Sequence, residues 1–120
     1  MNNTQVRQVL SRLVAKYGAR HVSEVIGCDR YSVVRYESGE RPVIPFATGW
    51  AILAMASRKR GACPDIPAKL ARLCEGMTHK EAGVLLGLDG DTVGSYISRK
   101  RKRIPWDVGR RVIALTRNFR

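Results

Sequence analysis

An internal repeat constrains this chain more than any other feature. When the sequence is aligned with itself at a shift of 60 residues, without gaps, 14 positions carry the same residue in both halves. Two unrelated segments of this length and ordinary composition would share about 3 or 4 residues. The identical pairs are Leu10 and Leu70, Arg12 and Arg72, Leu13 and Leu73, Gly27 and Gly87, Asp29 and Asp89, Val33 and Val93, Tyr36 and Tyr96, Ser38 and Ser98, Arg41 and Arg101, Ile44 and Ile104, Pro45 and Pro105, Gly49 and Gly109, Ala54 and Ala114, and Arg60 and Arg120.

The repeat predicts a tandem duplication, because the matches fall on glycines, helix caps and apolar positions rather than on scattered surface residues. We expect a first unit over residues 1–60 and a second unit over residues 61–120. Small, basic, Gly and Pro residues at positions 57–64 indicate a short linker between them.

Each half has the apolar spacing of four short helices, and no segment alternates as a strand does. The spacing from Val6 to Val14 predicts a first helix, capped by Thr4 or Asn3 and ended by Gly18. The sequence therefore predicts an all-α fold.

Three more helices are expected in the first half. A short helix ends at Gly27, Asp29 caps a third helix that runs to about Ser38, and Pro45 opens a fourth that stops near Arg58.

The second half repeats this plan. Thr78 and Glu81 have the spacing of a capping box, in which the hydroxyl and the carboxylate each bond an orphan backbone N–H. The other helix signals are Asp65 as a cap, Gly76 as a stop, Asp89 or Asp91 as a cap, and Pro105 as a start.

The second and third helices of each half carry the pattern of a helix-turn-helix motif. Two helices that cross steeply through a short turn need a small residue early in the first helix, here Ser23 and Gly83. Four residues later the turn needs a positive φ, and Gly27 and Gly87 stand there. The apolar positions that hold the crossing are Val22, Ile26, Cys28, Val33 and Tyr36 in the first unit and Ala82, Leu86, Leu88, Val93 and Tyr96 in the second.

The segment 26–42 resembles the λ repressor/Cro (Xre-type) family, in which a Glu-Gly-Arg-Pro pattern often follows the recognition helix. The segment 76–93 is similar to the LuxR-type helix-turn-helix, a likeness that we interpret as convergence because of the duplication. The resemblances cover about half of the chain. They imply a bacterial, phage or plasmid DNA-binding protein and a role in transcription regulation, with repressor ahead of activator.

The charge of the chain favours a polyanionic partner. Lys and Arg number 22 against 10 acidic residues, which gives a net charge of +12. Residues 1–60 carry 10 basic and 4 acidic side chains, and residues 61–120 carry 12 and 6, so each half has a net charge of +6. Double-stranded DNA is the first expectation and an anionic membrane surface the second; a basic protein without a polyanionic partner is the alternative.

The third helix of each unit is expected to lie in the major groove, with the following loop on the phosphates. Arg30 and Arg35 can each donate two hydrogen bonds to a guanine. The predicted DNA-binding residues are Arg30, Tyr31, Ser32, Arg35, Ser38 and Arg41 in the first unit and Asp91, Thr92, Ser95, Ser98, Arg99, Lys100, Arg101, Lys102 and Arg103 in the second.

The two predicted reading faces differ. Gly90 and Ser95 stand where the first unit has Arg30 and Arg35, but five consecutive basic residues follow at 99–103. We expect the first unit to read bases and the second to hold phosphates or read a weaker subsite. The alternative is that the second unit is a dimerisation or partner surface.

Other classes of function have little support in the sequence. No catalytic constellation or glycine-rich phosphate loop is visible, so we expect no enzyme and no cofactor. Cys63, Cys74 and His79 lack the paired spacing of a zinc site, so we expect no metal. Without an apolar span or a signal-like start, we expect a cytoplasmic, nucleoid-associated protein and no membrane partner.

The assembly on DNA stays open. The chain can act as a pseudo-dimer within one molecule, or as a homodimer on a palindromic site. The alternatives to a regulator are a DNA binder for plasmid or phage maintenance, transfer or replication control, a module that binds a protein partner, and an RNA-binding protein. RNA binding is disfavoured because the sequence offers no exposed aromatic platform.

Overall fold

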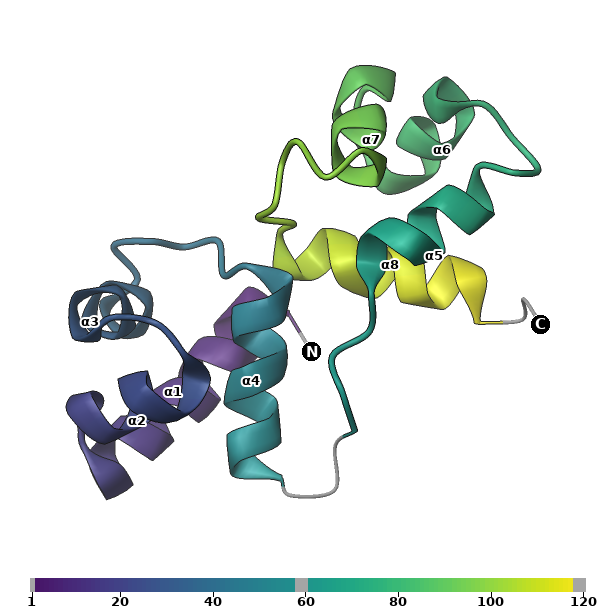
Figure 1. Cartoon of the computed structure of the whole chain (residues 1–120). Coiled ribbons are helices and arrows are strands. Elements are labelled where there is room, and N and C mark those ends of the chain that lie inside the picture. The colour runs from purple at the N-terminus through teal and green to yellow at the C-terminus, as the bar shows by residue number, and fades with distance from the viewer. Residues whose placement is uncertain (1, 58–60, 118–120) are drawn as a thin grey trace. The chain divides into compact units, whose positions relative to one another are not determined.

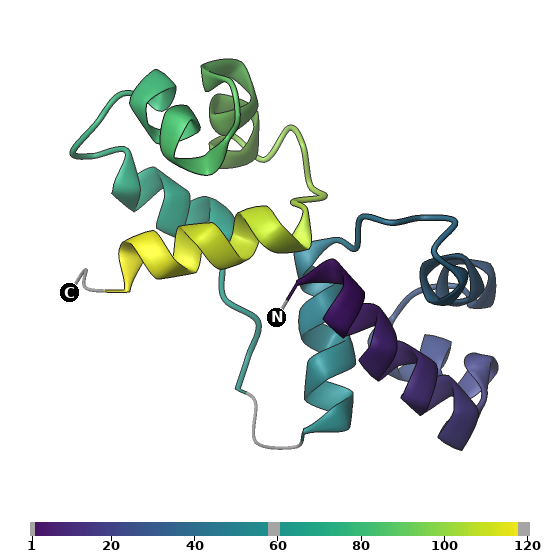
Figure 2. The same ribbon diagram turned by 180° about the vertical axis from the view of Figure 1, so that it is seen from behind.

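A computed structural model describes residues 2–57 and 61–117 of the chain. These residues form eight α-helices and no β-strand (Figures 1 and 2), which confirms the predicted all-α fold. The helices are α1 (Asn3–Tyr17), α2 (Ala19–Ile26), α3 (Arg30–Ser38), α4 (Phe46–Ala56), α5 (Ile66–Leu73), α6 (His79–Leu86), α7 (Gly90–Ile97) and α8 (Trp106–Thr116).

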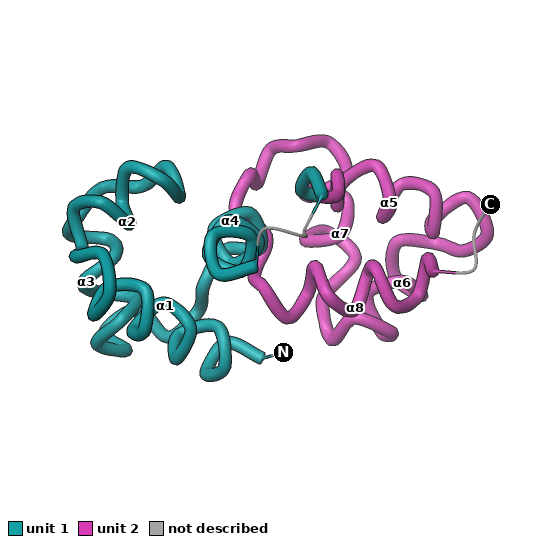
Figure 3. Tube along the Cα trace, turned by 90° about the horizontal axis from the view of Figure 1, so that it is seen from below, with its two compact units in different colours: residues 1–63 teal, residues 64–120 magenta. Residues whose placement is uncertain are grey.

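The chain divides into two compact units, unit 1 over residues 1–63 and unit 2 over residues 64–120 (Figure 3). Residues 58–60, which precede the predicted boundary between the two units, lie outside the described residues. Helix α4 ends at Ala56, and the predicted end at Arg58 is also outside them.

Unit 1 packs its four helices around one apolar core. Helix α1 contacts α2, α3 and α4, and α2 contacts both α3 and α4. The side chains of Leu10, Val22, Val33 and Ile52 are fully buried there. Asn3 accepts a hydrogen bond at 3.0 Å from the backbone N–H of Ile44, which fixes the start of α1 against the segment before α4.

Unit 2 builds its core from the corresponding helices. Helix α5 packs on α7 and α8, and α6 packs on α7 and α8. Leu70, Ala82, Val93 and Val112 are fully buried. Of the predicted crossing positions, Cys28 in unit 1 and Leu88 in unit 2 are half-buried and the other eight are buried.

Three of the helices in each unit begin at matching positions. Helices α2, α3 and α4 begin at residues 19, 30 and 46, and α6, α7 and α8 begin at 79, 90 and 106, so each pair is 60 residues apart. The first helices differ, because α1 has 15 residues and α5 has 8.

The predicted caps are confirmed at Asp29 and Asp65 and are wrong at the start of α1. Asn2, not Thr4 or Asn3, caps α1. Its side chain accepts from the Gln5 backbone N–H and its own N–H donates to the Gln5 side chain, each at 2.9 Å. The cap lies before both predicted candidates, because Gln5 stands three residues after Asn2 and closes a capping box with it.

Two predictions in the second half need correction. The Thr78 hydroxyl accepts from the Glu81 backbone N–H at 3.1 Å, but the Glu81 carboxylate accepts from that hydroxyl at 3.2 Å instead of closing the box on the backbone. Helix α5 ends at Leu73, three residues before Gly76. Of the two candidate caps for α7, Asp89 is the cap.

None of the described helices is long and apolar enough to cross a membrane.

Candidate nucleic-acid interface

A short glycine turn sets the crossing of α2 and α3. Gly27 has φ 78°, a left-handed conformation that costs a glycine little, and its N–H donates to the Ser23 carbonyl at 3.0 Å. Unit 2 repeats the turn with Gly87 at φ 71°, and there Leu88 N–H donates to the Gly83 carbonyl at 2.7 Å. Both predicted glycine turns therefore have the predicted conformation.

Helix α3 begins at its predicted cap. The Asp29 carboxylate accepts from the Ser32 backbone N–H at 2.6 Å. That hydrogen bond, with Arg41 and Arg35 nearby, holds the pKa of the Asp29 carboxyl below its usual value. The cap stays ionised at neutral pH and satisfies an orphan N–H in the first turn of the helix.

One face of α3 is open to solvent. Val33 is fully buried and Tyr36 is 5% exposed, so the opposite face carries the predicted reading residues. Tyr31 is 70% exposed, so the expectation that no aromatic side chain is exposed is wrong, and the Arg30 guanidinium lies 6.0 Å from the Tyr31 ring centroid. The exposed residues share one side of a 3.6-residue turn: Arg30, Tyr31, Val34, Arg35 and Ser38.

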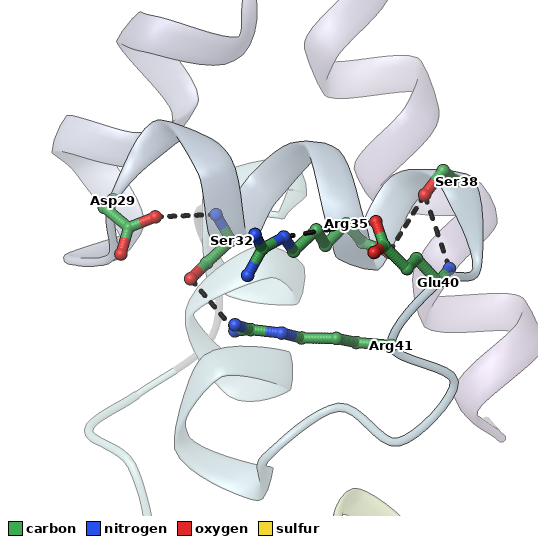
Figure 4. Close-up of polar contacts among 6 residues, drawn as sticks. All are labelled: Asp29, Ser32, Arg35, Ser38, Glu40 and Arg41. Carbon is green, nitrogen blue, oxygen red and sulfur yellow. Dashed lines mark hydrogen bonds and ion pairs between the residues drawn. The ribbon is translucent and has the colours of Figure 1, made fainter.

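The segment after α3 folds back along the helix (Figure 4). Arg41 donates from Nη1 to the Ser32 Oγ at 3.2 Å, and its guanidinium lies 5.8 Å from the centroid of the Tyr36 ring. Arg35 forms a weak ion pair with Glu40 at 4.0 Å, between Nε and Oε2. Figure 4 shows the Arg35 and Arg41 side chains extending back toward the first turn of α3.

Ser38 acts locally in the structure. Its hydroxyl donates to the Arg35 carbonyl at 3.2 Å and accepts from the Glu40 N–H at 3.3 Å, so it shapes the end of α3. The structure therefore brings all six predicted site residues of unit 1 onto α3 and the segment beside it. Together they offer several hydrogen-bond donors of the kind that contact base edges and phosphates.

The corresponding face of unit 2 is different in chemistry. No basic residue occurs within α7, and Asp91 is exposed in its first turn. The Thr92 N–H donates to Asp89 at 2.6 Å, and the Ser98 hydroxyl donates to the Ser95 carbonyl at 3.3 Å. The predicted residues Asp91, Thr92, Ser95 and Ser98 lie on and after α7, but they present no cation.

Arg99 opens the basic segment with a contact that the sequence did not predict. Its Nη2 lies 2.8 and 3.1 Å from the two oxygens of Asp65, the cap of α5. The hydrogen bonds from Arg99 are the main reason that the pKa of the Asp65 carboxyl is lowered. Arg99 also has φ 65°, a left-handed conformation that L side chains rarely adopt.

The other basic residues of this segment are exposed. They are Lys100, Arg101, Lys102 and Arg103. Arg101 N–H donates to the Ser95 carbonyl at 3.2 Å, and its charge contributes to the lowered pKa of Asp89. Arg99 is therefore occupied within unit 2, whereas Lys100, Lys102 and Arg103 form no ion pair with the described residues.

Within the described residues, no three His, Cys, Asp or Glu side chains lie close enough together to hold a metal ion. Cys28, Cys63 and Cys74 are not in disulfides. Burial raises the pKa of the Cys28 and Cys74 thiols, so these two are poor nucleophiles at neutral pH.

Comparison with known proteins gives no relative of the chain: it matches no family model, no curated protein and no solved structure. The predicted resemblances to the λ repressor/Cro and LuxR-type motifs stay predictions. The interpretation of the site depends on its own chemistry.

Proposed function

We propose that the chain is a sequence-specific binder of double-stranded DNA that reads bases with α3 of unit 1. The observation that carries this proposal is the exposed face of α3, which follows a tight glycine turn and presents two arginines beside an exposed tyrosine. A regulator of transcription, acting as a repressor by covering a promoter, is the role that fits such a small basic protein best.

The two arginines define the expected site. Arg30 and Arg35 are five residues apart, which corresponds to a rise of about 7.5 Å along an α-helix. Adjacent base pairs are stacked about 3.4 Å apart, so the two side chains would reach guanines about two base pairs apart. Each bidentate contact with O6 and N7 of guanine discriminates by about 1–3 kcal/mol.

Unit 2 has a supporting role in this proposal. We propose that it arose by duplication of unit 1, which the 14 identities and the 60-residue spacing of three helix pairs support. Its exposed basic segment would hold phosphates, a contact that carries little sequence information. Covalent linkage would raise the effective concentration of unit 2 at a duplex that unit 1 has bound.

The test is selection of bound duplexes from a random library, with the mass of the complex measured on the selected site. We expect an enriched motif that contains guanines about two base pairs apart. Arg30→Ala and Arg35→Ala should each relax the preference at one of these positions about tenfold or more. Arg12→Ala is the matched control, because Arg12 is an exposed arginine on α1 of the same unit.

Two outcomes would contradict the proposal: no enriched duplex at moderate salt, or an enriched motif that both arginine variants leave unchanged. The mass of the complex would show whether one chain or two occupy the site. Positions of the selected motif near an origin, rather than a promoter, would favour plasmid or phage maintenance over regulation of transcription.

A further inference from the structure

Unit 2 contains a hollow of about 440 Å³ at the N-terminal end of α7. One wall comes from α6 and the other from the turn and first residues of α7. The lining residues are Lys80, Val84, Leu88, Asp89, Gly90 and Asp91.

The matching positions of unit 1 carry bulkier or charged side chains. At the 60-residue offset, Glu24 corresponds to Val84, Arg30 to Gly90 and Tyr31 to Asp91. Glu24 is paired there with Arg20 at 3.6 Å, and this i,i+4 pair covers α2 with charge. Unit 2 has lost the arginine, the tyrosine and the ion pair, and in their place it has an open wall.

That wall is apolar and exposed. Val84 is 76% exposed, the largest fraction among the large apolar side chains of the described residues, and its neighbour Leu85 is 51% exposed. Packing within unit 2 does not account for them, because both point away from its core. Adjacent exposed aliphatic side chains beside a hollow are typical of a docking surface.

Two glycines bring α7 close to α6 at this place. A Cβ at Gly90 would lie 3.3 Å from the Lys80 backbone nitrogen, and a Cβ at Gly94 would lie 3.2 Å from His79 Nδ1. Arg30 and Val34 stand at the matching positions of unit 1. Glycine therefore lets the start of α7 pack on the first turn of α6, and position 90 adds no side chain to the hollow.

The local charge is negative in a strongly basic chain. Residues 79–98 contain Lys80 against Glu81, Asp89 and Asp91, a net charge of −2 with His79 neutral. The matching residues 19–38 contain three arginines and three acids, a net charge of 0, and the whole chain carries +12. The pKa of Asp89 is lowered, chiefly by the hydrogen bond from the Thr92 N–H, so this carboxylate stays ionised beside Asp91.

Arg101 partly offsets this charge, because it contributes to the lowered pKa of Asp89. Asp91 is exposed at the hollow and forms no ion pair with the described residues. Asp91 is therefore the carboxylate that a cationic partner would meet.

We propose that the hollow and its apolar wall, formed by Lys80, Val84, Leu88, Asp89, Gly90 and Asp91, dock a cationic, apolar segment of another protein. An aliphatic or aromatic side chain of the partner packs on Val84 and Leu88, and a neighbouring Lys or Arg pairs with Asp91. The phosphates of a nucleic acid would meet Asp89 and Asp91 here, which disfavours a nucleic acid as the occupant. The proposal stands whether or not unit 1 binds DNA.

The test is selection of a displayed library of random 12-residue peptides on the full chain. Enriched peptides are synthesised, and their affinity is measured for the protein and for two variants at exposed positions, Val84→Ser and Asp91→Lys. We expect peptides that place Lys or Arg next to Leu, Ile or Phe, and at least a tenfold loss of affinity in each variant. Val25→Ser is the matched control, because Val25 is an exposed valine on α2 of unit 1.

The outcomes separate the possible occupants. Enriched peptides that are acidic, or that bind both variants as tightly as the parent chain, would overturn the proposal. Self-association of the chain that Val84→Ser abolishes, measured by sedimentation, would overturn it in favour of a second copy. Circular dichroism checks the fold of each variant. If one variant is unfolded, the peptide affinity of the other variant decides the test.

DNA binding is measured in parallel and has a separate outcome. Val84→Ser should leave the affinity for a selected duplex unchanged, because Val84 lies outside the proposed DNA contacts. A loss of duplex affinity in this variant would place nucleic acid on the apolar wall and overturn the docking proposal. A chain that binds peptides but no duplex would refute the proposed function alone.

Discussion

Units 1 and 2 bury matching side chains in their cores but carry different side chains on the exposed faces of α3 and α7. Val33 and Val93 are both fully buried, and Tyr36 and Tyr96 are both 5% exposed. Asp29 and Asp89 cap their helices with hydrogen bonds of the same length, 2.6 Å. The exposed side of α3 carries two arginines, whereas α7 carries none. Burial and capping fix the helices, and the exposed positions that do not affect the fold are free to acquire different chemistry.

The segments after these two helices show a second contrast. Residues 39–43 contain one arginine and one glutamate, a net charge of 0, whereas residues 99–103 carry +5. Gly39 ends α3 at φ 84°, and Arg99 takes a similar conformation at φ 65° in unit 2. Unit 2 therefore has more positive charge after its helix and a less favourable residue at the left-handed position.

The largest expected effect tests whether unit 2 holds phosphates. Replacing Lys100, Lys102 and Arg103 together by Ala should weaken binding to every duplex by about 1 kcal/mol per charge at 0.15 M salt, roughly a hundredfold in all. The slope of log affinity against log salt should fall by about 2.7, because each phosphate contact contributes about 0.9. Filter binding or fluorescence anisotropy across a salt series measures both.

The control for this variant is Arg41→Ala, which removes the one basic residue of segment 39–43. Arg41 contacts Ser32 and Tyr36 on α3, so its loss should change the salt slope by about 1 at most. An unchanged salt slope in the triple variant would show that this segment does not contact phosphate.

The next largest effect is on the stability of unit 2, at the crossing of α6 and α7. A Cβ added at Gly83 would collide with the carbonyl oxygen of Leu88, a backbone atom that cannot move aside cheaply. Gly83→Ala should therefore destabilise unit 2 by about 2–3 kcal/mol, the upper part of the range for overpacking. The matching Ser23 already carries a Cβ, so Ser23→Ala should cost about 1 kcal/mol through the lost hydrogen bond to the Arg20 carbonyl.

Urea unfolding, followed by amide signals from each unit, separates these two effects. Equal losses of stability at Ser23 and Gly83 would show that the two crossings are equally tight.

The sequence predicted much of what the units share and little of what distinguishes unit 2. Apolar spacing predicts the eight helices of the described residues, and Asp29 and Asp65 are predicted as caps because Asp is a favoured cap residue before a helical run. Each accepts a hydrogen bond from the backbone N–H three residues later. The cap at Asn2 was missed because Asn3 and Thr4 are equally good cap residues by composition.

The missed features of unit 2 depend on residues far apart in the chain. The pair between Asp65 and Arg99 joins positions 34 residues apart, and no local pattern connects them. The exposure of Val84 depends on how α7 packs on α6, which periodicity does not report. Short-range patterns predict helices and caps well, but contacts between helices need the packed structure.

A smaller change in stability is expected at Gly39 and Arg99, which both have a left-handed backbone conformation. Gly39→Ala should destabilise unit 1 by about 1–2 kcal/mol, because a Cβ is unfavourable at φ 84° even where space is available. Arg99→Gly should stabilise unit 2 by about 1 kcal/mol. Both partners of the Arg99 ion pair are more than half exposed, so its loss offsets little of this gain. Thermal unfolding measures both changes, and a stability loss in Arg99→Gly would show that the ion pair outweighs the backbone strain.

The smallest expected effect is a loss of stability at acid pH that depends on Asp65. The folded-state pKa of Asp65 is lowered, so its contribution to stability is present above the unfolded value of about 3.9 and is lost as the pH falls through the folded value. The matching residue of unit 1 is Gln5, so Asp65→Gln gives unit 2 the neutral residue of its counterpart. This variant should melt below the parent chain at pH 6, and the gap should close as the pH falls below about 4. Asp29 and Asp89 titrate in both proteins, so they cancel from this difference. A gap that persists at pH 2 would mean that Asp65 stabilises α5 through its geometry and not through its charge.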